Sequence, residues 1–320
     1  MSALPKFVEF HEEGPREGFQ IEKQIYPLEQ RVRLIEMLAD SGLKQVQVGS
    51  FVNPRAVPQM ADTAQLFAAI KKRPGVRYTA LWLNQKGFEM ARGTPQVDLD
   101  GKLLFYTTDV FCVRNNNCNV AENQQRQAQW MRLYDQHDIA VESVYVITAF
   151  GCNFHGEVPM SAMLDQFRFA LDLCRGRKLP ALYLADTMGW ANPEAIKQRV
   201  AAVRSLAPDA RIGLHLHDTR GLGPANFYAA LEAGVDLFDS SVAGLGGCPF
   251  ASHADHTAAG NICTEDMVLM CQEMGVATGI DLDKLIAASQ FAEQLIGRTL
   301  NGKVMHGGNL GKYRNRAVSV

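Results

Sequence analysis

Residues 181–217 read ALYLADTMGWANPEAIKQRVAAVRSLAPDARIGLHLH and contain one strand–helix–strand unit. The apolar runs at 181–186 and 211–217 predict two strands. Between them, Asn192 is placed as an N-cap and Pro193 as the first helical residue. The apolar positions that follow keep helical spacing: Ile196, Val200 and Val203. A strand, a helix and a second strand in this order form the unit of a parallel sheet.

The same alternation runs through the rest of the chain. Eight runs are expected to be strands: 7–12, 45–51, 76–83, 103–109, 141–149, 181–186, 211–217 and 236–242. Helices are expected between them, among them 28–40 and 264–274, the latter with Thr264 as its cap and Gly275 as its stop. Eight strands alternating with helices indicate an α/β fold, and the count favours a closed (β/α)8 TIM barrel over an open doubly wound sheet. No GxGxxG follows the first strand, which also disfavours a dinucleotide-binding fold.

The domain organisation is expected to be simple. The chain has 320 residues and no low-complexity segment or Pro/Ser-rich linker, so residues 1–320 are predicted to form a single barrel domain. Residues 283–320 are expected to add a C-terminal helical extension, with an additional helix or helix pair over 283–298. That extension could cover the barrel or contribute to an oligomer contact.

Composition and charge argue against several classes of protein. Hydrophobic residues make up 47% and charged residues 21% of the chain, and the formal net charge is −2 with no basic or acidic block. This disfavours a nucleic-acid partner and an anionic membrane surface. No apolar run approaches the roughly 20 residues that span a bilayer, and residues 1–6 lack the features of a signal peptide. The seven cysteines are scattered without a CxxC pair, so a reduced, cytoplasmic protein is expected.

The end of the seventh predicted strand carries two histidines, His215 and His217. Side chains alternate along a strand, so both imidazoles are expected to point into the barrel at the end where barrel enzymes place their sites. Two imidazoles two residues apart suit two neighbouring positions on a metal ion. The alternative is a pair of hydrogen-bonded core histidines, and the position at the barrel mouth favours the metal.

The end of the first predicted strand, EGPREGFQ at 13–20, places an Arg–Glu pair between glycines. Glycine allows the backbone to approach a ligand closely. Glu17 could supply an oxygen ligand to the same ion, and Arg16 could hold a carbonyl or carboxylate oxygen. A surface salt bridge on a turn is the alternative.

The eighth predicted strand runs into a glycine-rich loop, GLGG at 244–247, followed by Cys248. A thiol at the tip of such a loop, above the barrel mouth, is placed to reach a bound substrate. The other six cysteines are expected to be small buried thiols.

Several segments resemble the 3-hydroxy-3-methylglutaryl-CoA (HMG-CoA) lyase family. SVAGLGGCPF at 241–250 looks like the signature of that family, and GPREGFQIEK at 14–23 resembles its GPRDGLQNEK. Four further segments are similar in the same way: SFVNPRAVPQMAD at 50–62 to SFVSPKWVPQMAD, ADTMG at 185–189 to GDTIG, HLHDTRG at 215–221 to HCHDTYG, and AGNICTED at 259–266 to SGNLATED. The resemblance covers nearly the whole chain, and the signature loop is specific to this lyase and its near relatives.

The resemblance implies a retro-Claisen cleavage on Mg²⁺ or Mn²⁺, and it assigns roles to individual residues. Arg16 would polarise the thioester carbonyl and stabilise the enolate, and Cys248 would transfer a proton. The implied metal ligands are Glu17, His215, His217 and Asn261. Asp186 and His215 would be among the polar, catalytic groups around the metal ligands. Gln20 and Lys23 would bind the coenzyme A part of the substrate, with Lys23 near the phosphates of coenzyme A. An imidazole and oxygen site with open positions suits these ions better than a thiolate zinc site.

Three departures from the family's pattern bear on the substrate. Glu17 stands where the family has Asp, which moves the carboxylate outward by one methylene group. Gln47 stands where the family's EATSF segment has an inward-facing Glu, and Gln can donate a hydrogen bond but carries no charge. The segment between Pro249 and Asn261 is a few residues longer and contains the added side chains His253, Asp255 and His256.

The leading interpretation is a metal-dependent lyase that cleaves a carbon–carbon bond of a 3-hydroxyacyl-CoA, with HMG-CoA to acetyl-CoA and acetoacetate as the first candidate. A related lyase or aldolase acting on another hydroxyacyl-CoA or hydroxy acid is the alternative that Gln47 and the longer loop favour. HDT after the histidines, in place of HND, disfavours an acetyl-CoA-dependent condensing synthase. A silent acyl-CoA-binding barrel is disfavoured by the retained site residues. A homo-oligomer is expected.

Overall fold

The computed structural model describes residues 4–247 and 260–314. The chain divides into two compact units. The middle unit contains Met1–Pro5, Leu99–Asp239 and Gly247–Asn261, and the terminal unit contains Lys6–Asp98, Ser240–Gly246 and Ile262–Val320. The expectation of one domain over 1–320 therefore stays a prediction.

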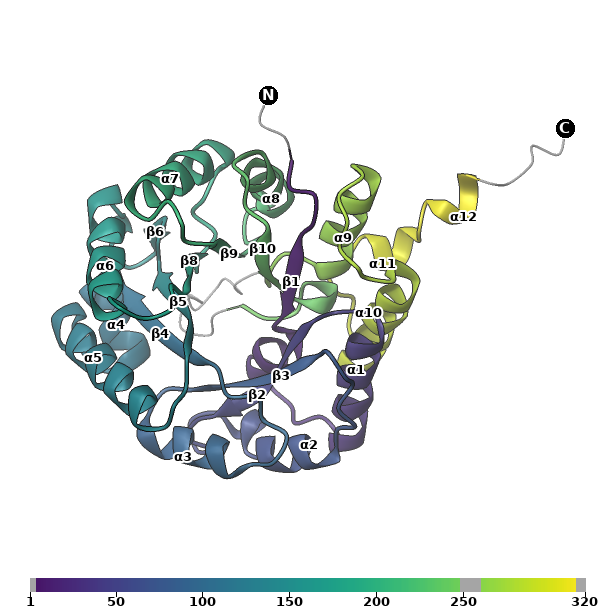
Figure 1. Cartoon of the computed structure of the whole chain (residues 1–320). Helices are drawn as coiled ribbons and strands as arrows, with labels where there is room; N and C mark the ends of the chain where they lie inside the picture. Colours follow the sequence, from purple (N-terminus) through teal and green to yellow (C-terminus); the bar gives the residue numbers. More distant parts are fainter. Residues whose placement is uncertain (1–3, 248–259, 315–320) are drawn as a thin grey trace, which may run out of the picture. The chain divides into compact units, whose positions relative to one another are not determined.

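The middle unit alternates strands with helices. Its strands are β4 (Gly101–Tyr106), β5 (Val141–Ile147), β8 (Ala181–Asp186), β9 (Ile212–Leu216) and most of β10 (Leu237–Ser240). Its helices are α4 (Asp109–Asn116), α5 (Val120–Gln136), α6 (Met160–Leu173), α7 (Pro193–Leu206) and α8 (Gly223–Glu232). A short antiparallel pair, β6 (Gly151–Cys152) and β7 (Gly156–Glu157), follows β5 and was not predicted. Helices α6, α7 and α8 pack in sequence order along this unit (Figure 1).

The terminal unit joins the beginning of the chain to its end. Its strands are β1 (Glu9–Glu12), β2 (Gln45–Phe51) and β3 (Arg77–Trp82), and its first helices are α1 (Leu28–Asp40), α2 (Thr63–Ala69) and α3 (Gln85–Gly93). Three short helical turns are η1 (Gly14–Gly18), η2 (Pro58–Met60) and η3 (Val242–Gly244). The later helices are α9 (Thr264–Glu273), α10 (Leu282–Ile296), α11 (Val304–Gly307) and α12 (Gly311–Arg314). Helix α10 packs on α1, so the C-terminal extension covers the N-terminal helix (Figure 1).

The strands pair in parallel within each unit. In the middle unit β10, β9, β8, β5 and β4 are neighbours in that order, and in the terminal unit β1 lies between β2 and the end of β10. Strand β10 continues from one unit into the other, and its last residue, Ser240, accepts a 2.9 Å hydrogen bond from the backbone N–H of Glu13. The sheet order is therefore β3-β2-β1-β10-β9-β8-β5-β4, and all eight predicted strands are confirmed.

The strand–helix–strand unit of residues 181–217 forms as its sequence predicts. Asn192 caps α7, because its side-chain oxygen accepts a 2.9 Å hydrogen bond from the backbone N–H of Ala195, and Pro193 is the first helical residue. The predicted stripe is buried: Ile196, Val200 and Val203. Strand β9 pairs with β8 so that His215 lies opposite Ala185. The local sequence thus decides where strand β9, which carries His215, begins and ends.

The predicted cap of the ninth helix is wrong. Helix α9 begins with Cys263 in the cap position, and no side chain caps it. The hydroxyl of Thr264 instead donates a 2.7 Å hydrogen bond to Oε2 of Glu12. Glu12 is buried, so a carboxylate without donors would be costly, and the hydroxyl satisfies it.

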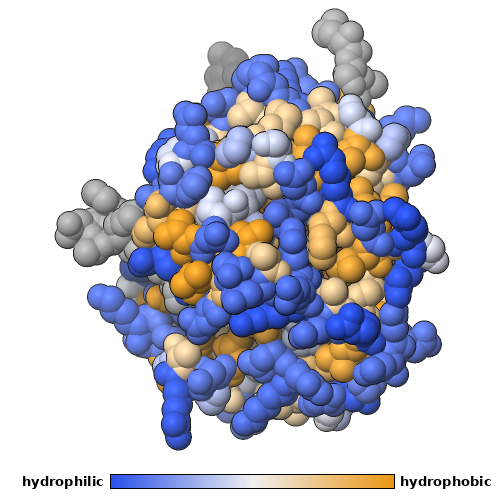
Figure 2. Space-filling model, turned by 90° about the vertical axis from the view of Figure 1, so that its left-hand side faces the viewer, coloured by the Kyte–Doolittle hydropathy of each residue, from blue (hydrophilic) through white to orange (hydrophobic). Residues whose placement is uncertain are grey.

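Within the described residues no helix is long and apolar enough to cross a membrane. The six described cysteines are buried, as predicted, and no two of them form a disulfide: Cys112, Cys118, Cys152, Cys174, Cys263 and Cys271. Figure 2 shows one face of the molecule, where hydrophilic residues surround scattered apolar groups. Scattered apolar residues are ordinary on protein surfaces, so this face alone indicates no binding site.

Candidate active site

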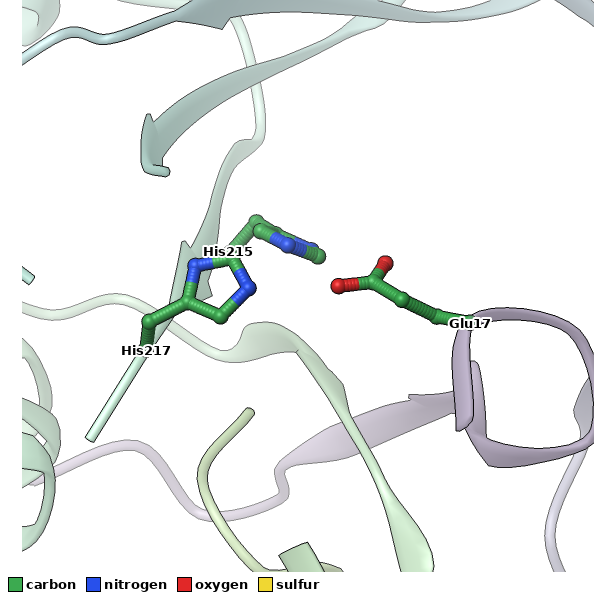
Figure 3. A group of neighbouring side chains, drawn as sticks. All are labelled: Glu17, His215 and His217. Carbon is green, nitrogen blue, oxygen red and sulfur yellow. The ribbon is translucent and has the colours of Figure 1, made fainter. Parts of the chain in front are cut away.

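His215 and His217 stand at the end of strand β9, and their rings contact each other. His215 is inside β9 and His217 follows its last residue. The ring centroids are 4.9 Å apart and the ring planes meet at 73° (Figure 3). Leu214 and Leu216, the alternate residues, are fully buried. Alternation along the strand therefore places both imidazoles on one face.

The Nδ1 atom of each imidazole has an oxygen partner. His215 Nδ1 lies 3.1 Å from Oδ2 of Asp239, the residue paired with it on β10. His217 Nδ1 lies 3.0 Å from the backbone oxygen of Asp186. Carbonyl and carboxylate oxygens accept hydrogen bonds, so each Nδ1 carries the proton. In metal sites this arrangement fixes the tautomer and makes Nε2 the ligating nitrogen.

Asp239 is a site residue that the sequence analysis missed. Its Oδ2 also accepts a 3.0 Å hydrogen bond from the hydroxyl of Tyr145, whose ring stacks on Tyr183 at a centroid separation of 4.3 Å. The signal was an acidic residue inside a predicted strand, 236–242. Its partner, His215, comes from another strand, so only the paired sheet identifies the role.

Asn261 lies beside His217. The two residues form an antiparallel bridge, and the backbone N–H of Asp218 donates a 3.1 Å hydrogen bond to the oxygen of Gly260. Asn261 is buried, with 1% of its surface exposed. Two of the residues predicted to bind metal are thus brought together from segments about 40 residues apart, as barrel-mouth sites require.

The carboxylate of Asp186 holds the turn that follows β8. Its Oδ1 accepts hydrogen bonds from the backbone N–H groups of Trp190 at 2.7 Å and Ala191 at 3.1 Å. Burial raises the pKa of Asp186 to about 6, and the two N–H groups and His217 oppose this shift. The backbone oxygen of Asp186 orients His217 at the same time. A catalytic role for its carboxylate stays a prediction.

Arg16 stands on the turn η1 among two carboxylates and an amide. Its Nη2 lies 2.6 Å from Oε2 of Glu13 and 3.0 Å from Oε2 of Glu17, and its Nε donates to Oε1 of Gln47. The side chains of Glu13 and Glu17 are only 3% and 9% exposed. A surface salt bridge is therefore wrong for this turn, because both acidic partners are buried.

Gln47 faces Arg16 from the middle of β2. The register of β2 against β3 shifts between Gln47 and Gly49, so a bulge follows the amide. A guanidinium group has only donors, so Gln47 presents its oxygen to Arg16 and directs its NH₂ group elsewhere. The neutral amide that distinguishes this chain from the family pattern is thus in contact with the predicted catalytic arginine.

Two buried carboxyl groups hold the start of the glycine-rich loop. Oε1 of Glu12 accepts 2.8 Å hydrogen bonds from the backbone N–H groups of Gly14 and Val242, and Oε2 of Glu265 accepts one of 3.0 Å from Ala243. A Cβ atom on Gly14 would lie 2.6 Å from Oε1 of Glu12, so only glycine fits there. Burial raises the pKa of Glu12 to about 7 and that of Glu265 to about 8.

The backbone of that loop is strained where the two carboxyl groups hold it. Ala243 has φ +57°, and positive φ values continue at Gly244, Gly246 and Gly247. A left-handed alanine is uncommon and needs surrounding structure to hold it, which the bond from Ala243 to Glu265 supplies.

Some predicted site residues lie outside the described residues, and others make no contact that supports the role predicted for them. Cys248 and the added side chains His253, Asp255 and His256 fall within 248–259, which the structure does not describe. Lys23 is exposed. Gln20 follows η1 and has a buried Oε1 atom without a hydrogen-bond partner. The roles of Gln20, Lys23 and Cys248 stay predictions.

Figure 3 draws three of the side chains that the resemblance implies as metal ligands: Glu17 of the terminal unit, and His215 and His217 of the middle unit. The donor set is one carboxylate and two imidazoles whose Nδ1 atoms are already held by oxygens. Mixed nitrogen and oxygen donors without a thiolate suit a divalent ion such as Mn²⁺ or Mg²⁺ and not a structural zinc site. The residues present therefore fit the implied metal.

Comparison with known proteins agrees with these motifs. The profile of the HMGL-like family matches residues 7–292. The chain is 38% identical over 307 residues to the mitochondrial hydroxymethylglutaryl-CoA lyase of Mus musculus, covering 95% of this chain and 90% of that one.

Solved structures agree as well. The hydroxymethylglutaryl-CoA lyase of Pseudomonas aeruginosa superimposes with a TM-score of 0.86 at 36% identity, over 95% of this chain and 98% of that one. An HMG-CoA lyase of Acinetobacter baumannii, solved with coenzyme A and 3-methylmalate, gives 0.84 at 32% identity, over 100% and 99%. The expected α/β fold, a (β/α)8 TIM barrel with additional C-terminal helices, is confirmed, and so is the resemblance: the chain belongs to the HMGL-like family.

Proposed function

We propose that the protein is a divalent-metal-dependent lyase that cleaves HMG-CoA into acetyl-CoA and acetoacetate. The observation that carries this is the pair of imidazoles at the end of β9, each with Nδ1 held by an oxygen, so that Nε2 of each would be the nitrogen to bind an ion. Glu17 and Asn261 complete the protein ligands in this proposal. Mg²⁺ and Mn²⁺ are the ions that this donor set favours.

The cleavage is a retro-Claisen reaction. The tertiary hydroxyl of the substrate loses its proton and becomes the ketone of acetoacetate. The bond between C2 and C3 breaks, and its electron pair moves to the α-carbon and carbonyl oxygen of the departing acetyl-CoA enolate. Protonation of that α-carbon gives acetyl-CoA, so the proton lost from oxygen is balanced by the proton gained at carbon.

Different residues of this chain contribute to different steps of this reaction. A divalent ion held by Glu17, His215, His217 and Asn261 would lower the pKa of the hydroxyl and polarise its oxygen. Arg16 donates to the thioester carbonyl oxygen, where negative charge develops, and Glu13 and Gln47 hold its guanidinium. Cys248 supplies the proton to the enolate carbon, and Glu12 and Glu265 hold the start of the loop that carries it. Asp239 and the backbone of Asp186 orient the two histidines.

Gln47 favours a second candidate, a related hydroxyacyl-CoA whose reacting carbon carries an additional acceptor such as a hydroxyl or carboxylate. The oxygen of Gln47 is used by Arg16, so its NH₂ group is the part that could meet such an acceptor. A buried donor without a partner disfavours the substrate that lacks the acceptor.

The two candidates are separated by one experiment. The purified protein with Mg²⁺ is incubated with HMG-CoA and with a panel of hydroxyacyl-CoA thioesters, and acetyl-CoA is measured by chromatography for wild type and Gln47→Glu. HMG-CoA is expected to give the highest kcat/KM of the panel. A preference for a thioester with the additional acceptor, reversed in Gln47→Glu, would establish the second candidate.

A cytoplasmic homo-oligomer completes the proposal. No disulfide joins any two of the six described cysteines, as expected where disulfides are rare. Light scattering on the purified protein tests the assembly, and a monomeric mass would contradict it.

A further inference from the structure

The guanidinium of Arg16 is held by a carboxylate, that of Glu13, to which the family resemblance assigns no role. Glu13 Oε2 lies 2.6 Å from Arg16 Nη2, closer than the 3.0 Å to Glu17 Oε2. Charge-assisted hydrogen bonds of this length are the strong ones. Gln47 holds the Nε atom of the same guanidinium, so two groups hold adjacent nitrogens.

We propose that Glu13 is a positioning residue that supplies the negative charge position 47 has lost. The family resemblance puts a glutamate at position 47, and this chain has the neutral Gln47 there. Glu13 contacts the same arginine from the end of β1. The inference rests on the proposed function, because it gives Arg16 its place on the thioester oxygen.

The backbone of Glu13 supports this role. Its oxygen accepts the backbone N–H of Arg16 at 3.1 Å and that of Glu17 at 2.8 Å, so Glu13 also begins the turn that carries both residues. Its side chain also contacts the guanidinium of Arg16, which is three residues later in the chain. Glu13 thus fixes the positions of both the backbone and the side chain of Arg16.

Burial makes the pairing necessary. The side chain of Glu13 is 3% exposed and that of Arg16 is 13% exposed. A buried charge is stable only when it is paired and hydrogen-bonded. Glu17 cannot fill this place alone if its carboxylate binds the metal, as proposed. Glu13 is a second carboxylate in contact with Arg16, so it can remain a partner of the arginine while the ion is bound.

Moving the negative charge from position 13 to position 47 tests the inference. Glu13→Gln is expected to lower kcat tenfold or more with a smaller change in KM, because an arginine that meets developing charge acts in the transition state. Adding Gln47→Glu to Glu13→Gln is expected to restore most of kcat, because the negative charge returns to the other side of the same guanidinium. Glu9→Gln is the matched control, since Glu9 is on strand β1, which ends one residue before Glu13, but pairs with His11.

A second readout needs no substrate. The Nε–H signal of Arg16, assigned in ¹⁵N-labelled protein by its loss in Arg16→Lys, is expected to exchange slowly with water. Glu13→Gln should speed that exchange, and the double variant should slow it again. If wild type fails to cleave HMG-CoA but the exchange follows this pattern, the proposed function is wrong and the role of Glu13 stands.

The inference would be overturned by a Glu13→Gln protein with unchanged Nε–H exchange, or by a double variant that recovers neither exchange nor kcat. Should Glu13→Gln fold poorly, Glu13→Asp keeps the charge one methylene group farther away. It is then expected to show faster Nε–H exchange than wild type, and wild-type exchange in Glu13→Asp would likewise overturn the inference.

Discussion

His215 Nδ1 lies 3.1 Å from Oδ2 of Asp239, and the same carboxylate oxygen accepts the hydroxyl of Tyr145. The two residues are directly paired between strands β9 and β10, so the sheet register itself brings them together. A carboxylate at this place fixes which nitrogen of His215 carries the proton and raises the basicity of the other. The metal affinity of the site should therefore depend on a residue that does not touch the ion.

Replacing Asp239 tests that dependence. Asp239→Asn is expected to weaken Mn²⁺ binding by roughly 10- to 100-fold, the usual cost of losing such a partner. Tyr145→Phe keeps the ring that stacks on Tyr183 and removes only one donor, so it should cost only a few-fold. Calorimetric titration with Mn²⁺ measures both. Equal affinity in wild type and Asp239→Asn would show that Asp239 does not orient the ligand.

His217→Ala is expected to abolish activity and weaken Mn²⁺ binding while the fold survives. His217 follows strand β9 and its removal leaves the strand pairs intact. Circular dichroism checks the fold, and Mn²⁺ titration checks the site. An unchanged Mn²⁺ affinity would remove His217 from the set of metal ligands.

Cys248 should be the cysteine most reactive toward alkylating agents, and substrate or product should protect it. Burial raises the pKa of Cys174 to about 11 and that of Cys271 to about 12, so these thiols should react slowly. Cys248→Ser should lose about 100-fold or more in turnover, as expected for a positioned proton donor. Mass-spectrometric mapping that finds another cysteine modified first, with activity intact, would refute this role.

The buried carboxyl groups beneath the loop should make stability depend on pH. The pKa of Glu265 rises from 4.5 to about 8 and that of Glu12 to about 7, so the folded protein keeps protons that the unfolded chain releases. The free energy of unfolding should therefore be highest below the unfolded pKa of 4.5 and fall as pH rises toward about 8. Asp186, with its pKa raised to about 6, acts in the same direction.

Glu265→Gln isolates one of these groups. Its stability relative to wild type should rise by at least ~1 kcal/mol between about pH 5 and about pH 9, since glutamine does not ionise. Urea unfolding at both pH values measures this. A difference between variant and wild type that stays constant with pH would mean that Glu265 is not protonated in the folded protein.

The strands and the histidine pair could be predicted because local patterns decide them. Alternation along 211–217 places His215 and His217 on one face, and Asn192 caps its helix through a residue three positions away. Such signals need no knowledge of the rest of the chain.

The partners of the site residues could not be predicted, because they come from distant segments. Thr264 reads as a helix cap, yet its hydroxyl serves Glu12, more than 250 residues earlier. Asp239 reads as an acidic residue inside a strand and Glu13 as one that follows a strand, and only the folded structure shows that they hold His215 and Arg16. A pattern identifies the kind of residue, whereas tertiary structure selects its partner.

We propose that this chain cleaves the bond between C2 and C3 of HMG-CoA on a divalent ion. The most direct test is to incubate the purified protein with Mg²⁺ and HMG-CoA and to quantify both products by chromatography and mass spectrometry. We expect acetyl-CoA and acetoacetate in equal amounts, loss of both on chelation with EDTA, and recovery when Mg²⁺ or Mn²⁺ is returned. Intact HMG-CoA after prolonged incubation with the metal-loaded protein, or cleavage that EDTA leaves unchanged, would contradict it.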